Sequence, residues 1–166
     1  MEKASVSHPF PPVFDAHSSI LILGSFPSLK SRENGFFYGH PQNRFWKVLA
    51  AVLSCETPQT IDEKKRFLLS HGIALWDVIA RCTVSGSSDS SIRDVTVNDL
   101  RQIQDGSDIR AIYTNGQTAD RLYRRYACPL CGREAVCLPS TSPANAAWTL
   151  DRLIGAWRVI ACPPEP

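Results

Sequence analysis

Two short segments, far apart in the sequence, combine the residue types that bind phosphate groups. The first is Gly24-Ser25-Phe26-Pro27-Ser28, and the second is Ser140-Thr141-Ser142-Pro143-Ala144-Asn145. Hydroxyl groups and backbone N–H groups in such loops bind the phosphates of nucleic acids. Serine is also a common turn residue, but the presence of two such loops favours phosphate contact. The candidate phosphate contacts are Ser25, Ser28, Ser140, Ser142 and Asn145.

Both loops follow predicted strands. The continuous apolar run 19–24 is typical of a strand that is buried on both faces of a parallel sheet. Further strands are predicted over 73–79, 110–116 and 134–138. Ligands bind beyond the carboxyl ends of the strands in open α/β sheets, so we expect the loops at 24–28, 77–83 and 140–145 to form one site. The segment 114–116 is more simply a turn.

Helical patterns separate these strands. The predicted helices span 45–53, 61–70, 96–103, 117–126 and 145–153, with a loop over 85–91 and a closing extended segment over 157–161. Strands that alternate with helices predict a three-layer α/β/α sandwich around a central four-stranded, mainly parallel sheet. The proline-rich segment 1–18 is expected to be an irregular arm, and 19–162 a single domain.

Composition and charge leave the class of partner open. The chain has 166 residues and a formal net charge of +2, which is weak for a dedicated nucleic-acid binder. Arg121, Arg124 and Arg125 cluster after a predicted strand. Such a run is usually the solvated face of a helix.

The cysteines predict neither a metal nor a cofactor. Cys128 and Cys131 form a single CxxC motif in a predicted loop, and no second pair completes a four-ligand zinc site. The chain starts without an apolar signal region and has no apolar run of the ~20 residues that a membrane span needs. We therefore expect free thiols, no membrane contact, and a monomer in the cytoplasm of a bacterial or archaeal cell.

The segment Tyr38-Gly39-His40-Pro41-Gln42-Asn43-Arg44-Phe45-Trp46, together with the two loops, resembles the uracil-DNA glycosylase superfamily. The run from His40 to Val48 is similar to the mismatch-specific uracil/thymine glycosylases. Its combination with Gly-Ser-Phe-Pro and Ser-Thr-Ser-Pro-Ala-Asn most resembles the hypoxanthine-DNA glycosylase branch. The resemblance covers residues 19 to about 154 and implies the α/β/α fold of that superfamily.

The resemblance also implies a pocket for a base that is flipped out of DNA. Tyr38 aligns with the aromatic residue that stacks on the flipped base, and stacking is worth ~1–3 kcal/mol. Phe26 stands in the first loop, where it would contact the base. Without the resemblance, Tyr38 is more simply a core or rim tyrosine beside Phe36 and Phe37.

The usual catalytic residues of the superfamily are missing. Phe26 and Ser140 replace the acidic or amide residue of the first loop and the His or Asn of the second. Asn43 is the best replacement, because an amide oxygen can orient a water without being ionised; it could equally cap the helix that starts near Phe45. Asp77 accepts hydrogen bonds only, which suits the N1–H of hypoxanthine. It could also stabilise a cationic sugar, or be a turn acid.

These residues predict a monofunctional DNA glycosylase of base excision repair whose preferred base is hypoxanthine. The catalytic residues are then Asn43 and Asp77, the base contacts Tyr38, Phe26 and Asp77, and the partner is DNA that contains a deaminated base. Two alternatives stay open: a uracil or mispaired-thymine glycosylase, and a DNA-binding module that reads lesions with little catalysis, which Phe26 and Ser140 would permit.

Overall fold

A computed structural model describes residues 4–84 and 92–161. Its centre is a four-stranded sheet in the order β3-β2-β6-β7. The strands are β2 (Ile20–Gly24), β3 (Ile73–Asp77), β6 (Ala111–Asn115) and β7 (Val136–Leu138), and all pair in parallel. Every residue of β2 and β3 is buried, as expected for strands covered on both faces.

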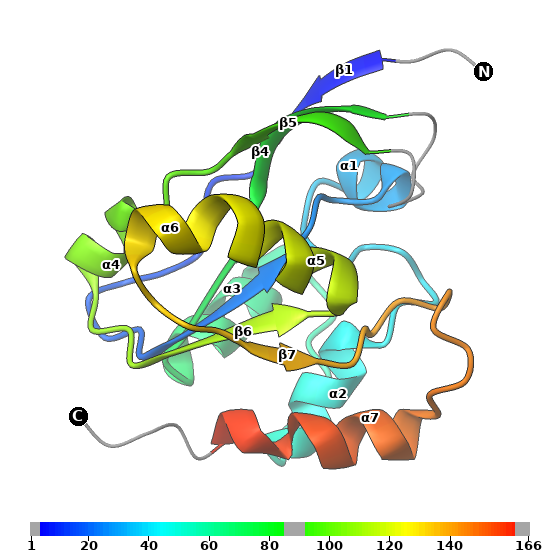
Figure 1. Cartoon of the computed structure of the whole chain (residues 1–166). Helices are drawn as coiled ribbons and strands as arrows, with labels where there is room; N and C mark the ends of the chain where they lie inside the picture. The colour runs from blue at the N-terminus through cyan, green and yellow to red at the C-terminus, as the bar shows by residue number, and fades with distance from the viewer. Residues whose placement is uncertain (1–3, 85–91, 162–166) are drawn as a thin grey trace.

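Helices cover both faces of this sheet (Figure 1). One layer contains α2 (Phe45–Val52), α3 (Ile61–Ser70) and α7 (Leu150–Trp157). The other contains α5 (Gln117–Leu122), a π-helical turn (Tyr123–Ala127) and α6 (Cys128–Cys131) in direct succession. The predicted α/β sandwich on a four-stranded parallel sheet is therefore confirmed. In the parts of the chain that the structure describes, no helix has the length and apolar character needed to cross a membrane.

A second, antiparallel sheet joins β1 (Ala4–Ser7), β4 (Ile79–Val84) and β5 (Arg93–Val97) in the order β1-β4-β5. The expected irregular arm over 1–18 therefore contains a strand, and it also packs into the core, since Phe10 and Val13 are buried. Val13 pairs with Leu75 through two backbone hydrogen bonds of 2.9 and 3.0 Å. Local sequence did not indicate this strand because its partner lies about 75 residues further on.

Four other predictions of local structure were wrong. The helix expected over 145–153 begins only at Leu150, as α7. The expected helix 96–103 begins only with α4 (Arg101–Gly106), because the β-branched residues before it form β5. The extended segment expected over 157–161 continues α7 as a 3-10 helix (Arg158–Ala161). Cys128 and Cys131 lie in a helix, not in a loop. A further helix, α1 (Leu29–Asn34), was not predicted, and the loop predicted over 85–91 lies outside the described residues.

The chain passes from the parallel sheet into the antiparallel one directly after Asp77. Val78 N donates to Gly24 O (2.8 Å) and Ile79 N to Ser25 O (3.1 Å), so the junction stays attached to the end of β2. The buried amide Nδ2 of Asn98 donates to the carbonyls of Asp77 (2.9 Å) and Ile79 (3.2 Å). Asn98 therefore fixes the backbone on both sides of the turn that carries Asp77.

We expect Asn98→Ala to lower the free energy of unfolding by about 2–3 kcal/mol, because it leaves two buried carbonyl groups without their amide donor. Chemical denaturation followed by circular dichroism measures this change. The matched control is Gln102→Ala, which removes an exposed amide and should change stability by less than about 0.5 kcal/mol. Equal stabilities for the two variants would contradict this role of Asn98.

Candidate active site

A cavity of about 670 Å³ opens at the carboxyl ends of the parallel strands. Eight of the predicted site residues line it: Ser25, Phe26, Ser28, Tyr38, Asn43, Asp77, Ser140 and Ser142. Asn145 is not among the lining residues; its Nδ2 donates to Ser140 O (3.0 Å) and so shapes the second loop. The structure thus brings together residues from loops that are separated by about a hundred positions in the sequence.

The end of β2 approaches Asp77 very closely. A Cβ atom on Gly24 would overlap Asp77 Oδ1 and would lie 2.7 Å from the Tyr38 hydroxyl oxygen. Only glycine permits this approach. The carboxylate and the tyrosine hydroxyl therefore meet beside Gly24, at the wall of the cavity.

His8 holds the other oxygen of Asp77. Its Nε2 lies 2.8 Å from Asp77 Oδ2, and the two side chains are only 3% and 4% exposed. His8 Nδ1 accepts a hydrogen bond from Phe10 N (3.1 Å), so the ring proton must be on Nε2, which donates it to Asp77. Oδ2 is thereby occupied, and Oδ1 is the oxygen beside Gly24.

Aromatic rings surround His8 and exclude water from this hydrogen bond. The ring centroids of Phe10, Phe26, Phe37 and Trp76 lie 5.6, 5.9, 5.7 and 6.3 Å from that of His8. Phe26 therefore supports His8 as well as lining the cavity. A buried hydrogen bond in such surroundings is electrostatically stronger than one in water.

Tyr38 has one face covered and an unusual backbone conformation. Its ring stacks on Phe45 with centroids 4.0 Å apart and planes inclined by 20°. Its φ of 54° lies in the left-handed region, which a bulky residue adopts only when its surroundings demand it. Stacking of a flipped base on Tyr38 stays a prediction.

Asn43 forms the predicted helix-start hydrogen bond and also lines the cavity. Its Oδ1 accepts from the backbone N of Phe45 (3.0 Å), the first residue of α2. The same oxygen accepts from the hydroxyl of Thr141 (2.9 Å). The N-cap residue of α2 is Arg44, so Asn43 lies one residue before the cap position; its side chain is hydrogen-bonded to the start of the helix and also lines the cavity.

The serine hydroxyls of the two loops have structural partners. Ser28 Oγ accepts from Ser31 N and caps α1. Ser140 Oγ accepts from Ser142 N, and Ser142 Oγ accepts from Ala144 N, both at 3.1 Å. These serines thus act as turn residues. The hydroxyl of Ser28 also donates to Ser31 Oγ (3.1 Å), so the hydroxyl hydrogens that could reach a phosphate are those of Ser140 and Ser142. Phosphate binding by all five predicted residues stays a prediction.

Arg44 attaches the second loop to the start of α2. Its guanidinium donates to the backbone carbonyls of Ser142 (2.9 Å), Asn145 (3.1 Å) and Trp148. Its backbone N donates to Thr141 O (3.1 Å). A planar group with several fixed donors suits such a task, which a lysine could not perform.

Sequence reasoning missed several lining residues. Asn115 lies at the end of β6, in the segment 114–116 that the sequence indicates as a simple turn. Thr118 lies in α5, within the predicted helix 117–126, and Thr141 lies in the second serine loop. Arg121 also lines it, whereas its neighbour Arg124 is paired with Asp120 (2.7 Å). A spacing of three positions places two residues near each other on a helix, so the sequence alone did not distinguish these two arginines.

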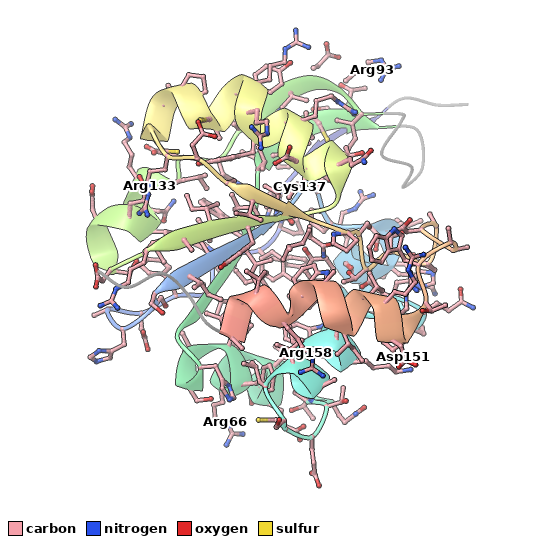
Figure 2. The ribbon with its side chains drawn as sticks, turned by 60° about the horizontal axis from the view of Figure 1, so that its bottom comes forward. Arg66, Arg93, Arg133, Cys137, Asp151 and Arg158 are labelled. Atoms are coloured by element: carbon pink, nitrogen blue, oxygen red, sulfur yellow. The ribbon has the colours of Figure 1, made fainter. Side chains whose placement is uncertain are left out.

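Other arginines lie on different sides of the molecule. Arg93 lies at the top of the view in Figure 2, whereas Arg66 and Arg158 lie in its lower half. Arg121 differs from these arginines because it lines the cavity.

The CxxC motif has a structural setting. The hydroxyl of Tyr123 donates to Arg133 O (2.6 Å) and lies 3.0 Å from Cys131 Sγ, while Cys128 Sγ donates to Arg133 O (3.3 Å). Burial raises the pKa of Tyr123, so its hydroxyl keeps the hydrogen that it donates. Within residues 4–84 and 92–161, no group of three or more His, Cys, Asp or Glu side chains is arranged to hold a metal ion.

The fold of this chain is also found in a solved structure. A solution NMR structure from Methanosarcina acetivorans, described as a candidate uracil DNA glycosylase, superposes with a TM-score of 0.76 and 31% identity. The match covers 91% of this chain and 96% of that one. The family model "Uracil DNA glycosylase superfamily" matches residues 11–161. The chain therefore belongs to the uracil DNA glycosylase superfamily.

Two curated relatives carry the name hypoxanthine DNA glycosylase. The one from Methanosarcina acetivorans is 36% identical over 148 residues, which cover 86% of this chain and 90% of the relative. The one from Methanosarcina barkeri is 35% identical over 139 residues, which cover 82% and 86%. The predicted resemblance to the hypoxanthine-DNA glycosylase branch is thus confirmed.

We expect His8→Ala to lower the free energy of unfolding by about 2–3 kcal/mol, because it leaves the buried Asp77 carboxylate without its donor. Thermal and urea melts measure the change. His17→Ala, which alters an exposed histidine of the same N-terminal segment, is the control and should be nearly neutral. A His8→Ala protein as stable as the wild type would show that Asp77 does not need this partner.

Proposed function

We propose that this protein is a monofunctional DNA glycosylase that flips hypoxanthine out of DNA and hydrolyses its N-glycosidic bond. The observation that carries the proposal is the buried Asp77 carboxylate, whose Oδ2 accepts from His8 and whose Oδ1 lies at the cavity wall beside Gly24. The names of the relatives from Methanosarcina point to the same base.

The carboxylate distinguishes hypoxanthine from adenine by hydrogen-bond direction. Deamination of adenine converts N1 from an acceptor into an N1–H donor. A carboxylate accepts only, so it binds the N1–H of hypoxanthine and repels the lone pair of adenine N1. Sites that form a hydrogen bond with one base reject an analogue that leaves the polar group unpaired. Guanine also has an N1–H and therefore belongs in every test of this proposal.

The remaining lining residues suit a flipped nucleotide. Extrusion of a base costs a few kcal/mol, and stacking of the base on Tyr38 offsets part of that cost. Tyr38 is itself supported from behind by Phe45. We propose that the serine loops and Arg121 bind the flanking phosphates, as arginine and hydroxyl groups do.

The chemistry is a water displacement at the anomeric carbon. The oxygen of a water held by Asn43 bonds to that carbon, and the bond to the purine nitrogen breaks with its electron pair going to the base. The water's extra proton leaves to solvent, and the purine takes up a proton from solvent, so an abasic site and free hypoxanthine result. The proposal includes a monomeric state and a cytoplasmic location, which rest on the sequence alone.

The wild-type protein should release hypoxanthine from an oligonucleotide faster than any other base of a panel. The panel contains hypoxanthine, adenine, guanine, xanthine, uracil and mispaired thymine, each in single- and double-stranded DNA, and abasic sites are detected by alkaline cleavage. Faster release of uracil or thymine would establish the alternative glycosylase. Tight binding to hypoxanthine DNA without release of any base would establish a lesion-binding module.

Asp77→Asn should lower the rate of hypoxanthine release by at least ~10²-fold. His8 can only donate from Nε2, so it will hold the new amide oxygen and turn the new NH₂ group toward the cavity, where it meets the N1–H as donor against donor. Single-turnover rates measure this loss, and Asp108→Asn, which changes an exposed acid, is the control. Unchanged release by Asp77→Asn would exclude base reading by Asp77.

A further inference from the structure

A chain of hydrogen bonds connects three segments that meet at the cavity: the end of β6, the second serine loop and the residues before α2. It runs from Asn115 through Thr141 to Asn43. Side-chain amides can be placed in either of two orientations in a structure. Here the backbone settles both orientations, because a backbone N–H can only donate.

Phe45 N donates to one side-chain atom of Asn43 at 3.0 Å, so that atom must be the amide oxygen. Thr141 N likewise donates to one side-chain atom of Asn115 at 3.0 Å, which must also be an oxygen. The Nδ2 group of Asn115 therefore faces the Thr141 hydroxyl and donates to it at 3.0 Å. Each direction follows from an adjacent backbone group rather than from an assumption about the side chains.

The single hydrogen of the Thr141 hydroxyl then has one destination. Thr141 Oγ1 already accepts from Asn115, so its own hydrogen is donated to Asn43 Oδ1 at 2.9 Å. Thr141 is completely buried, so water does not compete for this bond. Asn43 Oδ1 thus receives two hydrogen bonds, which use both of its lone pairs.

The other half of the Asn43 amide is left for the cavity. No hydrogen bond between the described residues uses Asn43 Nδ2, and Asn43 is half-buried and lines the cavity. The group that Asn43 can offer to a ligand is therefore a donor, whereas the sequence suggested that the amide oxygen would orient the water.

We propose that Asn115 and Thr141 are positioning residues that make Asn43 act as a hydrogen-bond donor, which holds the attacking water by its oxygen atom. This rests on the proposed function. A donor bond to the water oxygen leaves the hydrogens of the water pointing away from Asn43, so that the extra proton can leave to solvent while Asp77 binds the base. Positioning of this kind contributes through geometry, since small misplacements of a reacting group cost large factors in rate.

The decisive comparison is Asn43→Asp against Asn43→Ala. The aspartate keeps both accepted hydrogen bonds and loses only the donor. We expect both variants to lose ~10²-fold or more in the single-turnover rate. Asn43→Asp should keep the backbone hydrogen of Phe45 protected from exchange in NMR, whereas Asn43→Ala should not. An Asn43→Asp enzyme with wild-type or higher activity would overturn the donor role.

Thr141→Val and Thr141→Ser form a matched pair that tests the relay, by which we mean the hydrogen-bond chain from Asn115 through Thr141 to Asn43. Valine has nearly the shape of threonine but no hydroxyl, so we expect a loss of about tenfold or more in rate. Serine keeps the hydroxyl and should restore most of that rate, with unchanged affinity for abasic-site DNA in both variants. Equal rates for the two variants would show that the hydroxyl does not position Asn43.

These tests separate the relay from the base preference. The variants are compared with the wild type on whichever base of the panel it releases fastest, so a preference for another base leaves the relay test intact. If the wild type releases no base, the proposed function and the catalytic use of Asn43 both fail. The hydrogen-bond chain itself is then tested by amide hydrogen exchange. We expect Asn115→Ala to remove the protection of the Thr141 backbone hydrogen. If that hydrogen stays protected in the variant, the chain is refuted.

Discussion

The burial of one carboxylate is the constraint on which the rest of this structure depends. An ionised carboxylate cannot be buried without compensating hydrogen bonds, and Asp77 is 3% exposed. The compensation comes from His8, which reaches Asp77 from the N-terminal segment, and the aromatic cluster keeps water from that bond. The close approach of Gly24 and the clamp by Asn98 then fix the backbone from which Asp77 projects.

The cavity has a second wall that is organised independently. On that wall, Asn43 is held by Thr141 and by the start of α2, and Arg44 attaches the second loop to the same helix start. Among residues 4–84 and 92–161, the hydrogen bonds of the His8–Asp77 pair share no partner with those of this network. One wall therefore presents an acceptor and the other a donor, and the parallel strands β2 and β6, which pair directly, connect them.

Sequence reasoning identified the central sheet and most of the cavity because these depend on local patterns. The apolar run of β2 and the serine-rich loops are each contiguous, and the rule that ligands bind at the carboxyl ends of parallel strands brings them together. His8 could not be found in this way, because its partner is 69 positions away. Asn115 and Thr141 were missed for a different reason. Asn and Thr are common both in ordinary turns and at positions that orient a functional side chain, and only their hydrogen bonds distinguish the two roles.

The position of β1 has a consequence for how this protein loses its function. β1 is an edge strand that pairs with β4 alone, and the residue that contacts Asp77 follows directly after it. Edge elements open by local unfolding at lower free energy than the sheet at the centre of a domain. Detachment of this strand withdraws the histidine and admits water to the carboxylate while the parallel sheet remains folded. We therefore expect mild denaturant to abolish catalytic activity before it unfolds the parallel sheet.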